Sequence, residues 1–190
     1  IEILIVDDNS DIRKILNELI IDAGYKTRLA ANFNQALTEI DKKLPDVAII
    51  DVKLDKGDND GIQLLDHIKQ KNNDVPVIMI SGHANIEMAV NSLKSGAFEF
   101  IQKPFDKDRL LNFVNRAVEN FNLKKENKNL SNKLFHSFDL IGKSNNIISI
   151  KDQIEKLSQS ESRVFINGPT GSGKELVARK IYKKSKRNKG

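Results

Sequence analysis

The sequence predicts an α/β fold in which a doubly wound parallel sheet of five strands is covered by helices on both faces. Over the first 105 residues, short apolar runs that fit strands alternate with segments whose apolar residues recur at helical spacing. Two of the runs, VAII and VIMI, are apolar without alternation, which is typical of strands buried on both faces. Strands that alternate with helices in this way favour a parallel sheet between two helical layers.

The predicted elements follow one another in a regular order. Strands are expected at residues 1–6, 25–30, 47–50, 75–80 and 98–101, and helices at residues 11–20, 33–43, 61–71 and 86–96. The pair Ala23 and Gly24 ends the first helix, because glycine is a common helix terminator.

A further helix is expected to begin at Asp106 and to continue as a linker to residue 137. One apolar stripe along it comprises Leu110, Val114, Ala117 and Phe121, and a short heptad seam comprises Leu123, Asn127, Leu130 and Leu134. Two heptads leave two interpretations open, a helical linker that pairs in a dimer and a charged, partly frayed connector.

A second unit is expected from Phe138 onward. It contains a predicted helix around residues 147–157, a strand at residues 163–167 (RVFIN), a glycine-rich loop and a basic helix at residues 176–184. The predicted organisation is therefore a domain at residues 1–120, a helical linker at 121–137 and the beginning of another α/β domain at 138–190.

Composition excludes several classes of protein. The 190 residues include no cysteine, which excludes a disulfide framework, a thiolate metal site and a cysteine nucleophile. No apolar run approaches the roughly 20 residues that a membrane span needs, so we expect no membrane contact and a cytoplasmic location. The chain opens at Ile1 rather than Met and stops at Gly190 in a basic stretch, and we expect both ends to be cut.

The net charge of +5 hides two halves of opposite sign. Residues 1–105 carry 17 acidic and 12 basic side chains, whereas residues 106–190 carry 9 acidic and 19 basic ones. Such asymmetry indicates two units with different tasks.

Polar residues follow four of the predicted strands. Asp7 and Asp8 come after the first strand, Asp51 after the third, Ser81 after the fourth and Lys103 after the fifth. Ligands of open parallel sheets bind outside the carboxyl ends of the strands, so these side chains should converge on one site. Taken singly, each of these residues has a simpler interpretation as a helix cap or a turn residue. Their common position at strand ends favours a site.

The residue types indicate phosphoryl chemistry with a metal ion. Asp51 offers a carboxylate nucleophile, and Asp7, Asp8 and Asp51 supply the hard oxygen ligands that Mg²⁺ prefers. Three carboxylates close together repel one another unless a cation is present, which is a further argument for the metal. Lys103 brings a positive charge and Ser81 a hydroxyl donor to the phosphoryl oxygens.

Residues 1–120 resemble the receiver domain of two-component response regulators, through VDD at residues 6–8 and through Asp51, Ser81, Phe100 and the Lys103–Pro104 pair. The resemblance implies a flavodoxin-like fold, with Asp51 as the phosphoacceptor and the Lys53 main-chain carbonyl joining Asp7 and Asp8 as a Mg²⁺ ligand. It further implies that Ser81 and Phe100 form a switch pair, that Lys103 contacts the phosphate, and that the Lys103–Pro104 peptide is cis.

The loop after the acceptor, together with SGHANIEMAV at residues 81–90, resembles the NtrX-type branch of the NtrC class. The segment KLDKGDND after the acceptor is two residues longer than in most receivers and lacks their proline. Phe100 stands where tyrosine is commoner, so a signal through this ring would depend on packing and not on a new hydrogen bond.

The second unit carries a phosphate-binding motif of the form G-x-x-x-x-G-K between a predicted strand and a helix. The candidate nucleotide-phosphate ligands are Gly168, Thr170, Gly171, Ser172, Gly173, Lys174 and Glu175. Glu175 replaces the usual hydroxyl residue. The alternative is a glycine-rich turn with a chance lysine, which the strand–loop–helix setting disfavours.

The motif, together with the preceding LIGKS, resembles the opening of the AAA+ domain of enhancer-binding proteins that activate sigma-54 polymerase. This resemblance implies ATP as a ligand, but the parts that hydrolyse ATP, engage the sigma factor and bind DNA lie in regions that this chain does not contain. We therefore expect no efficient hydrolysis and do not class the chain as an enzyme.

The predicted function is that of a response regulator. A sensor histidine kinase would transfer a phosphoryl group to Asp51 in the presence of Mg²⁺ and thereby control a sigma-54-dependent activator, with a homodimer as the expected assembly. One alternative is a phosphate sink or dimerising decoy without transcriptional output. Another is a nucleotide-binding enzyme, which depends on the phosphate loop alone.

Overall fold

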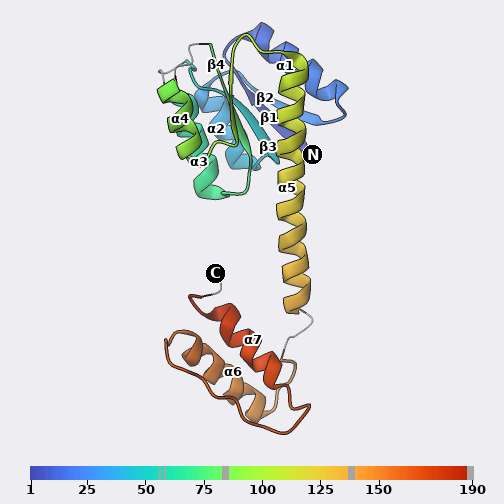
Figure 1. The fold of residues 1–190 in the computed structure, drawn as a ribbon, viewed down its shortest axis with the longest axis vertical. Helices are drawn as coiled ribbons and strands as arrows, with labels where there is room; N and C mark the ends of the chain where they lie inside the picture. The colour runs from blue at the N-terminus through green and yellow to red at the C-terminus, as the bar shows by residue number, and fades with distance from the viewer. Residues whose placement is uncertain (56, 58, 83–85, 137–139, 188–190) are drawn as a thin grey trace. The chain divides into compact units, whose positions relative to one another are not determined.

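The computed structural model describes residues 1–55, 57, 59–82, 86–136 and 140–187, with the main chain alone for residues 131–136 (Figure 1). The chain divides into two compact units, Ile1–Glu126 and Asn127–Gly190. None of the helices in the described ranges is long and apolar enough to cross a membrane.

The first unit is built on a five-stranded parallel sheet with the strand order β2-β1-β3-β4-β5. The strands are β1 (Glu2–Val6), β2 (Lys26–Ala30), β3 (Val47–Asp51), β4 (Val77–Ser81) and β5 (Glu99–Gln102). The helices are α1 (Ser10–Asp22), α2 (Phe33–Lys42), α3 (Asp60–Lys71), α4 (Ile86–Lys94) and α5 (Lys107–His136). This confirms the predicted doubly wound fold.

Alternate residues of the strands pack into two separate hydrophobic cores, one on each face of the sheet. On β1, Leu4 and Val6 belong to a core with residues of α2 and α3, whereas Ile3 and Ile5 belong to a second core with residues of α1 and α5. Successive side chains of a strand point to opposite faces, so a strand buried on both sides has no polar position. Every residue of β3 and β4 is buried, as their uninterrupted apolar patterns predicted.

Helix α5 serves the first unit and extends beyond it. Its stripe residues Leu110, Val114 and Ala117 are buried in the second core. The helix runs without a break to His136, so the predicted continuation is observed, although residue 137 and the predicted start at Phe138 lie outside the described residues. Of the predicted seam, Leu123 and Leu130 are exposed, and the side chain of Leu134 is outside the described part.

The second unit contains α6 (Asn145–Ser158) and α7 (Lys174–Lys184), close to the predicted helices. The predicted strand at residues 163–167 is wrong, because this segment forms no strand and Phe165 in its middle is 90% exposed. A strand exists only through ladder hydrogen bonds to a neighbour, and within the described residues of this unit no neighbouring strand is present.

The turn between β3 and α3 brings two backbones into close contact at Gly61. The Gly61 N–H donates to the carbonyl oxygen of Val52 at 2.9 Å. A Cβ atom at Gly61 would lie 2.0 Å from the carbonyl oxygen of Asp51 and 2.8 Å from the Cα of Val52. Only glycine permits this approach, which fixes the chain immediately after Asp51.

We expect Gly61→Ala to destabilise the first unit by about 2 kcal/mol or more, because the added methyl group meets main chain that cannot move aside. Chemical unfolding followed by circular dichroism measures the loss. Gly82→Ala is the matched control, since a Cβ at exposed Gly82 meets nothing within 4 Å. Equal stability of the two variants would contradict the close approach.

Candidate functional site

The carboxyl ends of four strands bring the predicted site residues together. Asp7 follows β1, Asp51 and Ser81 are the last residues of β3 and β4, and Lys103 follows β5. Asp7, Asp51 and Ser81 are all buried. The sheet therefore assembles in space what the sequence separates by about a hundred positions.

Lys103 joins two of the carboxylates directly. Its Nζ donates to Oδ2 of Asp7 at 2.7 Å and to Oδ2 of Asp51 at 2.5 Å. The Lys103 side chain is 13% exposed, so these charge-assisted contacts lie in a setting that water screens only partly. The ammonium group compensates part of the negative charge at this end of the sheet.

Three carboxylates form a candidate metal centre. One carboxylate oxygen each from Asp7, Asp8 and Asp51 lies within 4.8 Å of the other two. Asp8 is exposed, whereas Asp7 and Asp51 are buried. Hard oxygen donors that leave room for water on one side fit Mg²⁺, which retains several waters and binds through few carboxylates.

The surroundings of Asp7 and Lys103 shift the pKa of each side chain. Burial raises the pKa of Asp7 and the neighbouring Asp51 charge raises it further, although the hydrogen bond from Lys103 acts in the opposite direction. Burial alone would lower the pKa of Lys103, but its hydrogen bonds to Asp51 and Asp7 outweigh this effect and raise the pKa. The lysine is therefore held in its charged form beside Asp51.

The loop after Asp51 folds back on the carboxylate. The Lys53 N–H donates to Oδ1 of Asp51 at 3.3 Å, so Lys53 lies beside Asp51, while the metal role of its carbonyl stays a prediction. Two residues of the predicted long loop, Lys56 and Asp58, lie outside the described residues.

Ser81 and Phe100, the predicted switch pair, lie on adjacent strands. The Ser81 hydroxyl donates to the sulfur of Met88 on α4 at 3.8 Å. Phe100 packs against the core that contains Leu4 and Val6. Phe100 and Lys103 also line a cavity of about 450 Å³ together with residues of α4 and α5. The Lys103–Pro104 peptide is cis, as the receiver resemblance implied.

Sequence reasoning missed two residues that hold the site. Gly61 makes the close approach to Asp51 described above, and its only signal in the sequence was a glycine in a polar stretch. Arg13 on α1 donates from Nη1 to the carbonyl oxygen of Asp7 at 2.6 Å, for which the sequence contains no recognisable pattern.

The glycine-rich loop of the second unit has the backbone that phosphate loops need. Gly171 and Gly173 have φ values of 80° and 83°, in the left-handed region that favours glycine. Lys174 opens α7, and its Nζ donates to the carbonyl oxygens of Gly168 at 2.8 Å and Pro169 at 2.6 Å.

The remaining candidate ligands of this loop, Thr170, Ser172 and Glu175, lie on either side of Lys174 in the sequence. The Ser172 N–H donates to the carbonyl oxygen of Pro169, and Thr170 lies in the turn between them. The Glu175 carboxylate accepts from Arg179 one helical turn later, at 2.6 Å. Glu175 is thus engaged in an ion pair along its own helix.

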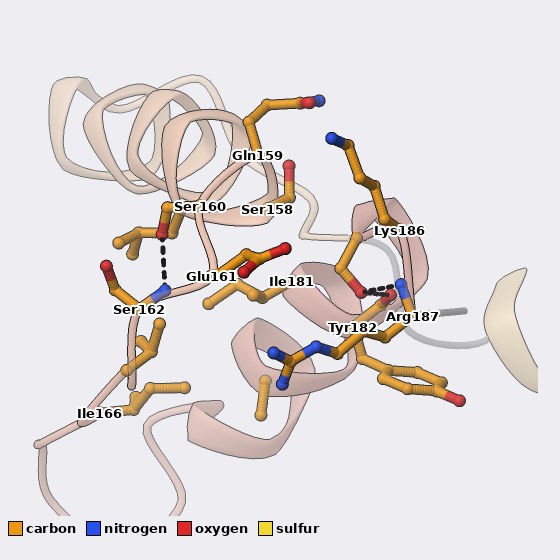
Figure 2. A pocket seen from close by; sticks show the side chains of 14 residues that line it. Ser158, Gln159, Ser160, Glu161, Ser162, Ile166, Ile181, Tyr182, Lys186 and Arg187 are labelled. Carbon is orange, nitrogen blue, oxygen red and sulfur yellow. Dashed lines mark hydrogen bonds between the residues drawn. The ribbon is translucent and has the colours of Figure 1, made fainter. Parts of the chain in front are cut away.

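A separate cavity of about 270 Å³ lies in the second unit (Figure 2). It is lined by the end of α6, the segment that follows it, Tyr182 in the last turns of α7, and Lys186 and Arg187 just beyond that helix. The loop from Gly168 to Glu175 does not contribute to its described lining, so this cavity is distinct from the phosphate loop.

Comparison with known proteins identifies the family. The model of the response regulator receiver domain matches residues 3–115. The chain belongs to the response regulator receiver family. A second model, that of the sigma-54 interaction domain, matches residues 140–190 of this response regulator.

Individual relatives agree with this assignment. The chain is 44% identical, over 98% of its length, to an NtrX-like response regulator of Rickettsia bellii. The crystal structure of NtrX from Brucella abortus in complex with ADP is 41% identical, with a TM-score of 0.64 and coverage of the whole chain. A beryllofluoride-activated NtrC4 receiver domain dimer is 33% identical over 63% of the chain and 98% of its own, with a TM-score of 0.59.

The relatives are longer than this chain. It spans 39% of the Rickettsia protein and 42% of the Brucella chain. This response regulator is therefore NtrX-like, with a receiver domain followed by part of a sigma-54 interaction domain.

We expect Asp7→Asn to raise the metal-free stability of the chain at neutral pH by about 1 kcal/mol, because the substitution removes a buried charge. The raised pKa of Asp7 means that its contribution to stability is present below the unfolded pKa and is lost as pH rises through the folded pKa. The stability advantage of Asp7→Asn over the wild-type chain should therefore shrink as pH falls. Thermal melting in EDTA between acid and neutral pH measures it.

Asp66→Asn, at an exposed position on α3, is the control and should change stability by less than about 0.5 kcal/mol. Mg²⁺ should stabilise the wild-type chain more than Asp7→Asn. Destabilisation by Asp7→Asn in EDTA would contradict the cost assigned to the buried carboxylate.

Proposed function

We propose that the receiver domain accepts a phosphoryl group on Asp51 from a sensor histidine kinase and thereby controls the unit that follows. The observation that carries this proposal is the convergence of Asp7, Asp8 and Lys103 on Asp51 at the carboxyl edge of the sheet. An isolated strand-end aspartate would need none of these partners.

In the proposed reaction, a carboxylate oxygen of Asp51 attacks the phosphorus of a phosphohistidine. The phosphorus–nitrogen bond breaks, its electron pair returns to the imidazole, and an aspartyl phosphate forms. The Lys103 ammonium, already 2.5 Å from Asp51, stays charged and stabilises the phosphoryl oxygens. Mg²⁺, held by Asp7, Asp8, Asp51 and the Lys53 carbonyl, supplies further positive charge when it is bound.

The proposed signal begins at Ser81. Its hydroxyl donates to the sulfur of Met88 on α4 in this structure. It would instead donate to the new phosphoryl group, and the contact with α4 would be lost. Phe100 would then repack beside the cavity that it lines with α4 and α5. Phosphorylation would act by shifting the population between two packings of this face, with α5 as the route to the second unit.

We also propose that the chain forms a homodimer through its linker. Leu123 and Leu130, seven residues apart on α5, are 58% and 52% exposed, which leaves an apolar strip available to a second copy. The similarity to the NtrC4 receiver domain dimer supports the same state. Contacts with sigma-54 polymerase and with DNA are assigned to regions outside this chain.

The second unit is proposed to bind ATP through the loop from Gly168 to Glu175. The two left-handed glycines expose main-chain N–H groups at the start of α7, which is the arrangement that cradles phosphates. The similar Brucella NtrX structure contains ADP. Because the parts of such a domain that hydrolyse ATP lie in regions that this chain does not contain, we propose binding without efficient hydrolysis by this chain.

We expect Asp51→Asn to abolish labelling by acetyl phosphate with Mg²⁺, because the amide is not a nucleophile toward phosphorus. Phosphate-affinity electrophoresis reads the labelled fraction directly. Asp22→Asn, exposed at the end of α1, should be labelled like the wild type. Undiminished labelling of Asp51→Asn would move the acceptor to another residue.

We expect Lys174→Ala to weaken ATP binding by roughly tenfold or more, the loss of a charge-assisted contact to phosphate. Titration with a fluorescent ATP analogue measures the affinity, and phosphate release by the same samples should not exceed the background. Lys183→Ala removes an exposed charge from the same helix and is the control. Equal affinities for Lys174→Ala and the wild type would contradict the proposed site, and rapid turnover would contradict the lack of hydrolysis.

A further inference from the structure

We propose that Arg13 is a positioning residue for the metal site, holding the main chain of the turn that carries Asp7 and Asp8. This inference rests on the proposed function, because it concerns how the same three carboxylates bind Mg²⁺. Arg13 itself need not touch the metal ion or the phosphoryl group.

The turn after β1 must direct the side chains of two consecutive residues, Asp7 and Asp8, toward the same site. Successive side chains of a strand point to opposite faces of a sheet, so Asp7 and Asp8 could not share one site in an extended chain. The Asp7 N–H still donates to the carbonyl oxygen of Ala30, at 3.3 Å, and α1 begins three residues later at Ser10. The main chain must therefore bend between Asp7 and Asn9.

The bend is held from two directions. The Asn9 N–H donates to Oδ1 of Asp7 at 2.9 Å, and the Asn9 side chain caps α1 by accepting from the N–H groups of Asp11 and Ile12. Arg13 donates from Nη1 to the carbonyl oxygen of Asp7 at 2.6 Å and approaches that of Asp8 at 3.4 Å. The Arg13 N–H donates to the carbonyl oxygen of Asn9, so α1 and the turn are locked together.

A charged donor suits this position for two reasons. The nearby donors, the Asn9 N–H and the Lys103 ammonium, are engaged with Oδ1 and Oδ2 of Asp7, so the main-chain carbonyl oxygens of the turn depend on another donor. The guanidinium group presents several N–H donors in a fixed plane and is always charged, which favours it over an amide or an ammonium. Partners that orient metal ligands affect affinity strongly although they lie outside the coordination sphere.

The decisive experiment compares Mg²⁺ binding by the 190-residue chain and its variants in isothermal titration calorimetry. Arg13→Gln, whose side chain is too short to reach the carbonyl groups, should raise the Kd for Mg²⁺ by about tenfold. Arg13→Lys keeps the charge but not the planar fork and should raise the Kd by about threefold. Lys14→Gln removes the neighbouring exposed charge and should leave the Kd unchanged.

Labelling by acetyl phosphate distinguishes positioning from general damage. At low Mg²⁺, Arg13→Gln should label more slowly than the wild type, and at saturating Mg²⁺ it should reach the same maximum rate. An unchanged Kd in Arg13→Gln, or an equal loss in Lys14→Gln, would overturn the inference. If Arg13→Gln does not fold, an unchanged Kd in Arg13→Lys would overturn it.

The same titration separates this inference from the function on which it rests. A wild-type chain that binds no Mg²⁺ and accepts no label on Asp51 would refute the proposed function. A wild-type chain that does both, with variants of Arg13 that behave identically, would refute only the role of Arg13.

Discussion

The receiver domain depends on the placement of negative charge at one edge of a buried sheet. Asp7 follows β1 and Asp51 ends β3, both are buried, and one carboxylate oxygen of Asp8 lies within 4.8 Å of theirs. Burial and the neighbouring Asp51 charge oppose the ionisation of Asp7, as its raised pKa reflects. The two contacts from Lys103 offset part of this cost, and a divalent cation, as proposed for this cluster, would offset more of it.

The sequence predicted the first unit well because its signals are local and repeated. Strands such as β3 are apolar from Val47 to Ile50 and end in Asp51, and the topology of a parallel sheet then brings the strand ends together without further information. Arg13 and Gly61 were missed because their roles depend on main-chain atoms of other segments, which no pattern of residue types records. The predicted strand at residues 163–167 failed for the related reason that a strand requires a partner.

Helix α5 packs its first turns into the core of the first unit and then continues as the linker helix. Leu110 and Val114 bury its first turns in the core beside α1, so the helix is fixed to the sheet at the level of β5. Because the helix continues unbroken to His136, its later turns have no independent hinge within the described main chain. A change in how its first turns pack would therefore move the part of α5 that belongs to the first unit.

Lys103 is the point from which such a change would start. Its ammonium group contacts Asp51, while its main-chain N–H donates to the carbonyl oxygen of Ser81 at 2.8 Å, and α5 begins only four residues later. One residue thus contacts Asp51, the strand that carries Ser81 and the segment that leads into α5. A phosphoryl group on Asp51 must rearrange the Lys103 contacts, because its oxygens compete for the same ammonium. In the proposed reaction, phosphorylation of Asp51 would therefore act through Lys103 on the segment that leads into α5.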